Sequence, residues 1–187
     1  MIARDPETPP LSGDTLKIVI IGAGIGGLLA SIGLRLDGHN VIILEQATSF
    51  GEVGAGMRIP PNSFKILHRW GIDLTYMKKT YSNGNRFLRY DDGAILADMP
   101  HGIPEWDFGG SYLMIHRADY HKILLDKALE LGVVIRGSTR VDDYEWSTQT
   151  AIVNGGERVQ GDLLVIADGE SNKVVIAREL SGLCGSS

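Results

Sequence analysis

Two short apolar runs and an amphipathic stretch between them form the strongest pattern near the start of the chain. The run LKIVII at 16–21 is rich in β-branched residues, and NVIILE at 40–45 is similar, which is typical of buried parallel strands. Between them Leu28, Ile32 and Leu36 lie four residues apart and share one face of a helix. The pattern predicts a β-α-β unit with a right-handed crossover.

The rest of the chain shows shorter elements. In order, the sequence predicts a Gly/Pro-rich loop at 51–62, a helix at 63–70, a hairpin at 86–97 turning at Asp92-Gly93, a loop at 98–110, a strand at 111–116, a helix at 117–131, a strand at 133–137, a meander at 140–154 and a strand at 162–169. Together these elements predict an α/β fold. We expect a Rossmann-like parallel sheet flanked by helices, with a small antiparallel sheet.

Composition excludes several classes of protein. The 187 residues carry 18 Lys and Arg against 23 Asp and Glu, a net charge of -5, so nucleic acid is not an expected partner. A single cysteine, Cys184, rules out an internal disulfide and suits a reducing, cytoplasmic location. No run is long enough to span a membrane, and the N-terminus lacks a secretory signal. His116 and His121 lie five apart, which does not fit a helical metal pair, and no metal is expected.

The turn after the first strand carries the pattern G-x-G-x-x-G, at Gly22, Gly24 and Gly27. In a dinucleotide fold the first glycine permits the tight turn, the second leaves room for a pyrophosphate, and the third allows close helix packing. The helix N-terminus offers free N–H groups to the phosphates. Glu45 ends the second strand, where a carboxylate accepts hydrogen bonds from ribose hydroxyls and disfavours a 2′-phosphate. The alternative is a tight turn that binds no ligand.

This unit alone does not separate FAD from NAD. Three later segments, GEVGAGMRIPPN (51–62), YLMIHRADYHKILL (112–125) and DLLVIADG (162–169), resemble successive segments of the flavin-dependent aromatic hydroxylases. These are single-component, NAD(P)H-using FAD monooxygenases, and the resemblance is strongest to salicylate-hydroxylase-like members. It extends over about residues 16–175.

The resemblance implies further cofactor-binding residues. Gly56 and Arg58 match the loop that runs beside the flavin, and Arg117 matches an arginine that contacts the cofactor. Asp168 and Gly169 match an Asp-Gly motif that serves both FAD and NAD(P)H. Each also has a structural interpretation: Arg58 as a solvated loop charge, Arg117 as a helix cap or a partner of Asp119, and Asp168-Gly169 as a simple turn.

The resemblance also implies the reaction. NAD(P)H reduces the bound flavin, which then uses dioxygen to hydroxylate a small phenolic or salicylate-like ring. Because the cofactor carries this chemistry, no catalytic residue is assigned from the sequence. After the Asp-Gly motif this chain has Asn172 and Val175 where the family has a serine and an arginine. A cationic side chain is thus missing from a place that meets phosphates or ribose, which counts against binding of NAD(P)H in the way the family binds it.

The resemblance also sets the expected domains. We expect a flexible leader at 1–15, an FAD-binding domain formed by 16–80 and 117–180, an excursion at 81–116 into a partial substrate-domain sheet, and a tail at 181–187. Family members are roughly twice as long, so a truncated hydroxylase is expected, whose unfinished sheet edge favours self-association. The alternatives are a non-catalytic FAD- or nucleotide-binding fragment and an NAD-dependent dehydrogenase.

Overall fold

The computed structural model describes residues 13, 15–49, 55–74, 77–100 and 110–169. The chain forms two compact units, one made of Ala3–Gly51 with Ile123–Ser187 and the other of Glu52–Lys122. The expected leader, apart from residues 13 and 15, and the expected tail lie outside the described residues.

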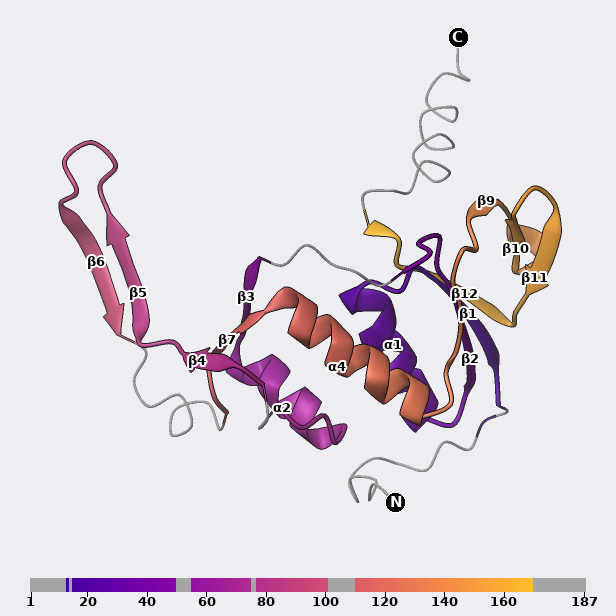
Figure 1. The fold of residues 1–187 in the computed structure, drawn as a ribbon, viewed down its shortest axis with the longest axis horizontal. Coiled ribbons are helices and arrows are strands. Elements are labelled where there is room, and N and C mark those ends of the chain that lie inside the picture. Colours follow the sequence, from indigo (N-terminus) through magenta and orange to yellow (C-terminus); the bar gives the residue numbers. More distant parts are fainter. Residues whose placement is uncertain (1–12, 14, 50–54, 75–76, 101–109, 170–187) are drawn as a thin grey trace, which may run out of the picture. The chain divides into compact units, whose positions relative to one another are not determined.

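Four parallel strands form the sheet of the first unit, in the order β12-β1-β2-β8 (Figure 1). They are β1 (Lys17–Ile21), β2 (Asn40–Leu44), β8 (Val134–Arg136) and β12 (Leu163–Ile166). β1 has a partner on each side, and its residues Ile18 to Ile21 are all buried, as expected for a parallel strand covered on both faces. The sheet confirms the predicted α/β class.

Helix α1 (Ile25–Leu36) is the crossover between β1 and β2. It buries Leu28 and Ile32 on the predicted face, and its end is marked by Gly38, which has φ +93° and donates its N–H to the carbonyl of Arg35. The later helix α4 (Arg117–Glu130) begins in the second unit and ends in the first. Within the described ranges no helix is long and apolar enough to cross a bilayer.

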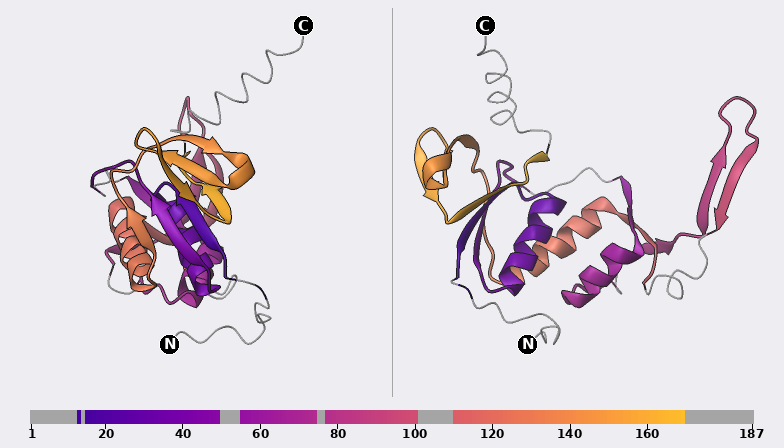
Figure 2. Two further views of the ribbon diagram at one scale, coloured as in Figure 1. Left: turned by 90° about the vertical axis from the view of Figure 1, so that its right-hand side faces the viewer. Right: turned by 180° about the vertical axis from the view of Figure 1, so that it is seen from behind.

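A three-stranded antiparallel meander covers the face of the parallel sheet opposite helix α1 (Figure 2). Its strands are β9 (Val141–Glu145), β10 (Thr150–Val153) and β11 (Glu157–Gln160), with the 3-10 turn η1 (Trp146–Thr148) between the first two. Val19, Ile21 and Leu44 of the sheet pack against buried meander side chains, which are Tyr144, Ala151, Val153 and Val159. The sequence predicted the first two strands but not β11.

The second unit contains a sheet of order β3-β7-β4 and helix α2 (Pro61–Arg69). Its strands are β3 (Gly56–Ile59), β4 (Lys79–Tyr81) and β7 (Leu113–His116), all paired antiparallel. The predicted loop at 51–62 was therefore wrong over 56–59: the glycines and prolines around GMRI indicate a loop, but the segment becomes a strand by pairing with β7. Residues 50–54 lie outside the described part.

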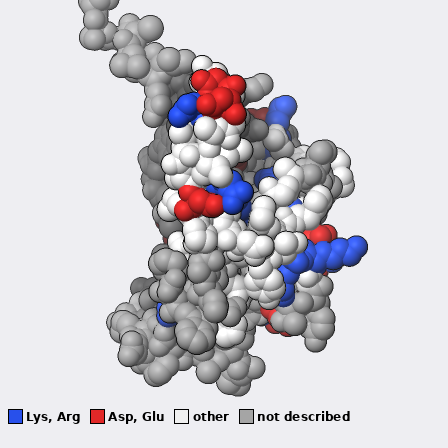
Figure 3. Space-filling model, turned by 90° about the vertical axis from the view of Figure 1, so that its left-hand side faces the viewer, with Lys and Arg blue, Asp and Glu red and all other residues white. Residues whose placement is uncertain are grey.

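The predicted hairpin is confirmed as β5 (Gly84–Leu88) and β6 (Ile95–Pro100). Its turn is closed by the N–H of Arg89, which donates to Ala94, and by Asp92, whose carboxylate accepts the N–H of Ala94. β6 extends to Pro100, into the predicted loop at 98–110; residues 101–109 are outside the described part. Its exposed apolar side chains are Phe87, Leu88, Tyr90, Ile95, Leu96 and Met99. In Figure 3 the described residues are mostly uncharged, with a few acidic and basic side chains among them.

Candidate dinucleotide site

The carboxyl ends of β12, β1 and β2 meet at one edge of the parallel sheet of the first unit. The glycine-rich turn follows β1, Glu45 follows β2, and Asp168-Gly169 follows β12. In open α/β sheets this edge is where ligands bind. The topology therefore brings together three sequence motifs that are far apart in the chain.

Gly22 is required by its backbone and by its neighbours. Its φ of +99° is a conformation that L side chains rarely adopt. A Cβ there would lie 2.7 Å from the carbonyl oxygen of Ala167 and 3.0 Å from the Cα of Asp168. The turn after β1 is thus in direct contact with the Asp-Gly segment, an arrangement that only glycine permits.

Gly27 and Gly24 serve different purposes. A Cβ on Gly27 would lie 2.0 Å from the carbonyl oxygen of Gly22, so this glycine allows α1 to approach the turn. Around a Cβ on Gly24, by contrast, no atom of the described residues lies within 4 Å beyond its chain neighbours and its own helix. Gly24 is also the N-cap of α1, with no side-chain cap and no acidic residue in the first turn. The first-turn N–H groups and open space suit a pyrophosphate.

The carboxylate of Glu45 is held against this turn. One oxygen accepts the N–H of Ala23 at 2.7 Å, and the other accepts the N–H of Ala47 at 2.8 Å. An ionised carboxylate has about four acceptor positions, so hydroxyl donors can be added to these two bonds. The spacing predicted that Glu45 would lie near the fingerprint, and the structure places it in contact with the turn.

Asp168 is half-buried, and burial raises the pKa of its carboxyl group. It acts electrostatically on Tyr144 of the meander: burial and then the charge of Asp168 raise the pKa of this phenol to about 12. Gly169 follows with φ +63°, a left-handed conformation that suits a turn. Sequence reasoning did not single out Tyr144, because its proximity to Asp168 depends on the meander. Asn172 and Val175 lie outside the described residues.

The remaining expected cofactor residues lie in the second unit. Gly56 pairs with His116, and the N–H of Arg117 donates to the carbonyl of Ala55 at 3.0 Å, so the start of α4 is fixed to the start of β3. Arg58 is exposed, and its guanidinium donates to the side-chain oxygen of Asn85 at 3.1 Å. Asn85 carried no signal in the sequence.

The structure therefore places the expected site residues in two groups. The first unit holds Gly22, Gly24, Gly27, Glu45, Asp168 and Gly169, and the second holds Gly56, Arg58 and Arg117. Among the described residues, no three His, Cys, Asp or Glu side chains come together as a metal site requires.

Known proteins share this sequence and fold. The FAD binding domain family matches residues 15–185. The FAD-dependent monooxygenase OpS4 of Beauveria bassiana is 35% identical over 167 residues, which cover 83% of this chain and 38% of that protein. The 3-hydroxybenzoate 6-hydroxylase 1 of Aquipseudomonas alcaligenes is 38% identical over 161 residues, which cover 82% of this chain and 40% of that protein.

Among solved structures, FqzB is similar with a TM-score of 0.71 and 25% identity, over 89% of this chain and 38% of that one. The oxygenase of 2-methyl-3-hydroxypyridine-5-carboxylic acid matches in fold, with a TM-score of 0.69 at 23% identity, over 86% of this chain and 41% of that one. The chain thus spans about 40% of the length of the relatives that it matches. The family match confirms the resemblance inferred from the motifs and FAD as the family's cofactor. This chain belongs to the FAD binding domain family, together with FAD-dependent monooxygenases and aromatic hydroxylases.

Proposed function

We propose that this chain binds FAD and serves the hydroxylation of a small aromatic substrate, with NAD(P)H as reductant and dioxygen as oxidant. The observation that carries the proposal is the convergence of the Gly22–Gly27 turn, Glu45 and Asp168 at one sheet edge in a member of the FAD binding domain family. Two relatives are named for 3-hydroxybenzoate and 6-hydroxynicotinate, so a ring with a hydroxyl and a carboxylate is the proposed substrate class.

The residues of the first unit would hold the nucleotide part of FAD. The open space at Gly24 and the N-terminus of α1 receive the pyrophosphate, and the carboxylate of Glu45 accepts hydrogen bonds from ribose hydroxyls. Asp168 and Gly169 are proposed contacts for FAD and for NAD(P)H.

In the second unit, Gly56 and Arg58 are proposed to lie beside the flavin, and Arg117 to contact the cofactor. Arg58 is exposed and held by Asn85, so its charge is presented on a defined side of β3. When bound, FAD supplies the redox chemistry, and these residues bind and orient it.

The first experiment measures FAD binding by the full chain. Purified protein is titrated with FAD, and the flavin absorbance and fluorescence are followed. We expect a yellow complex in the wild type and in Gly26→Ala, because a Cβ on Gly26 meets no described atom within 4 Å. Gly24→Val places a side chain in the proposed pyrophosphate space, so this variant should bind FAD poorly. Wild-type protein that stays colourless in excess FAD would overturn the proposal.

Turnover is tested with an oxygen electrode, NADH or NADPH, and a panel of hydroxylated aromatic acids. Oxygen uptake stimulated by one of these acids supports the hydroxylase. FAD binding without substrate-stimulated uptake supports the second candidate, a non-catalytic FAD-binding module. Tighter binding of NAD than of FAD would instead support a dehydrogenase.

We also propose that residues 81–116 begin a substrate-domain sheet beside an FAD-binding domain formed by 16–80 and 117–180. The exposed fractions of Phe87, Ile95 and Met99 are 52%, 60% and 56%, which is high for apolar side chains. Because the hairpin strands pair only with each other among the described residues, both outer edges are open to further pairing. Self-association through this hairpin is the expected result, and a stable monomer in light scattering would contradict it.

A further inference from the structure

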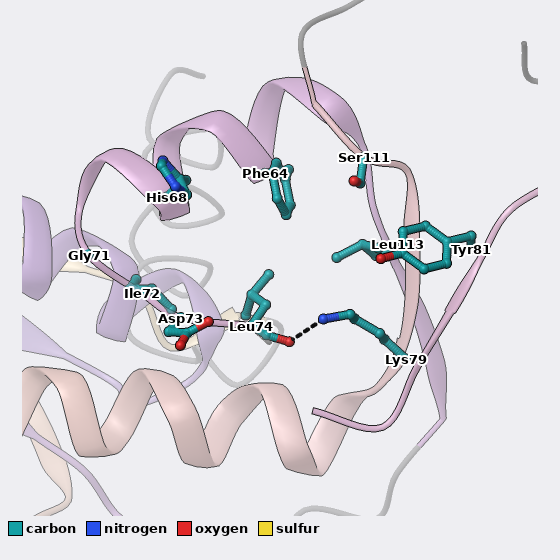
Figure 4. Close-up of a pocket in the computed structure, with 10 residues that line it drawn as sticks. All are labelled: Phe64, His68, Gly71, Ile72, Asp73, Leu74, Lys79, Tyr81, Ser111 and Leu113. Atoms are coloured by element: carbon teal, nitrogen blue, oxygen red, sulfur yellow. Dashed lines mark hydrogen bonds between the residues drawn. The ribbon is translucent and has the colours of Figure 1, made fainter. Parts of the chain in front are cut away.

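The second unit contains a cavity of about 610 Å³ between α2 and the strands β4 and β7, called here the α2–β4 pocket (Figure 4). Its lining residues are Phe64, His68, Gly71, Ile72, Asp73, Leu74, Lys79, Tyr81, Ser111 and Leu113. Small-molecule sites usually have volumes of about 300–1,000 Å³. The pocket is therefore large enough for one substituted ring, and every lining residue belongs to the same compact unit.

One part of the pocket is apolar. Ile72, Leu74 and Leu113 are buried, with exposed fractions of 4%, 5% and 1%, and form an apolar floor. The ring of Phe64 extends from α2 toward the same space (Figure 4). Aromatic and aliphatic walls of this kind favour a flat apolar group, because its burial removes apolar surface from water.

The strand side of the pocket is polar. In Figure 4 the ammonium group of Lys79 and the hydroxyls of Tyr81 and Ser111 all point into the cavity from β4 and the segment before β7. The Nζ of Lys79 donates to the carbonyl oxygen of Leu74 at 2.7 Å, which fixes the positive charge at the cavity edge. The carboxylate of Asp73 lies on the other side of the pocket, away from this ammonium (Figure 4). The ammonium and the two hydroxyls give the strand side hydrogen-bond donors of the kind that bind an anionic group.

The pocket lies on the opposite face of the β3-β7-β4 sheet from Arg58. Side chains alternate between the two faces of a strand, and Arg58, Met114 and Thr80 form one exposed row across the three strands. Lys79, Tyr81 and Leu113 point to the other face, toward α2. A ligand in the pocket would thus be separated from Arg58, the residue proposed to lie beside the flavin, by the sheet itself.

We propose that the α2–β4 pocket is a second binding site for a monocyclic aromatic carboxylate and that its occupancy does not require FAD. The ring packs against Phe64, Leu74 and Leu113, and the carboxylate faces the charge of Lys79 and the hydroxyl of Tyr81. Binding at this pocket does not depend on the proposed hydroxylation.

The test uses the full chain with benzoate as the probe, measured by ligand-observed NMR and calorimetry with and without saturating FAD. Benzoate should bind equally in both states and about tenfold or more weakly to Lys79→Met, because the charge-assisted contact is lost. Lys79→Arg should restore part of the affinity. Lys78→Met is the matched control, because Lys78 is exposed and does not line the pocket. Uncharged benzamide should not distinguish Lys79→Met from the wild type.

Tyr81→Phe provides a second variant in case Lys79→Met unfolds, since Tyr81 is 58% exposed and tolerates the loss of its hydroxyl. It should weaken benzoate binding several-fold and leave benzamide binding unchanged. The proposal is wrong if benzoate does not bind at millimolar concentration, if it binds only with FAD present, or if neither pocket variant changes its affinity. FAD binding is followed separately by flavin absorbance, so a failure here is distinct from a failure of the proposed function.

Discussion

Replacement by alanine should have different effects at Gly24, Gly26 and Gly27 in the turn after β1, because the space around an added Cβ differs among them. In Gly27→Ala the new Cβ would lie 2.0 Å from the carbonyl oxygen of Gly22, whereas an ordinary contact begins at 3.4 Å. The helix or the turn must therefore move by the difference, about 1.4 Å, and both are backbone. Overpacking of this kind costs about 3 kcal/mol at the upper end of its usual range. We expect Gly27→Ala to lose about that much free energy of unfolding.

Gly26→Ala is the matched control, one residue away in the same helix. Its Cβ meets no described atom within 4 Å, and alanine is a better helix former than glycine by about 1 kcal/mol. This variant should be as stable as the wild type or slightly more stable. Gly24→Ala should remain within about 1 kcal/mol of the wild type, because its backbone is extended and its surroundings are open. It should nevertheless bind FAD at least about tenfold more weakly if the pyrophosphate occupies that space.

Urea unfolding followed by circular dichroism measures the three free energies, and flavin fluorescence measures the three affinities. We expect only Gly27→Ala to lose substantial stability and, of the other two variants, only Gly24→Ala to bind FAD more weakly than the wild type. If Gly27→Ala were as stable as Gly26→Ala, the close approach of α1 to the turn would be refuted. If Gly24→Ala bound FAD like the wild type, the pyrophosphate would have to lie elsewhere.

Other residues give further predictions. In Glu45→Gln one of the N–H groups of Ala23 and Ala47 loses its acceptor, because an amide has a single oxygen. We expect the free energy of unfolding in urea to fall by about 1–3 kcal/mol and FAD binding to weaken. Gln46→Ala, at an exposed neighbour, is the control. Burial raises the pKa of Asp168, so the folded state holds the proton of this carboxyl more tightly than the unfolded state does. The free energy of unfolding should therefore fall as pH rises from 3.8 through the raised pKa, and Asp168→Asn should flatten this fall. The same pH dependence of stability in Asp168→Asn and in the wild type would contradict this. The pKa of Tyr144 is likewise raised to about 12, so stability should be lost between about pH 10 and 12, less steeply in Tyr144→Phe. Asn85→Ala removes the hydrogen bond that the guanidinium of the exposed Arg58 donates to Asn85. It should change the free energy of unfolding by less than about 0.5 kcal/mol but raise the KM of any turnover. An unchanged KM would show that this hydrogen bond does not position Arg58 for binding.

Local patterns predicted the β-α-β unit well, because its signals are contained in short segments. The apolar run at 16–21 becomes β1, and Gly38, Gly71 and Gly132 all follow helices with positive φ. The fingerprint and Glu45 were also predictable, since the distance between them is set by one helix and one strand.

The elements that sequence reasoning missed depend on partners far along the chain. β3, β4 and β11 are each only three or four residues long, and they are strands because β7 and β10 pair with them. The contact between Arg58 and Asn85, and the proximity of Asp168 and Tyr144, arise in the same way. No spacing rule links such residues, because the chain between them follows the whole fold.

The pairing of β1 with β12 also has a consequence for synthesis on the ribosome. Residues paired across these strands are 145 positions apart in the sequence, as Ile18 and Leu163 are. At about 5–20 residues per second, a nascent β1 waits roughly 7–30 s for its partner to be translated. During this time its apolar edge is open to other strands and to chaperones. The yield of folded protein in a cell therefore depends on how well this edge is protected during translation, and not only on the stability of the finished sheet.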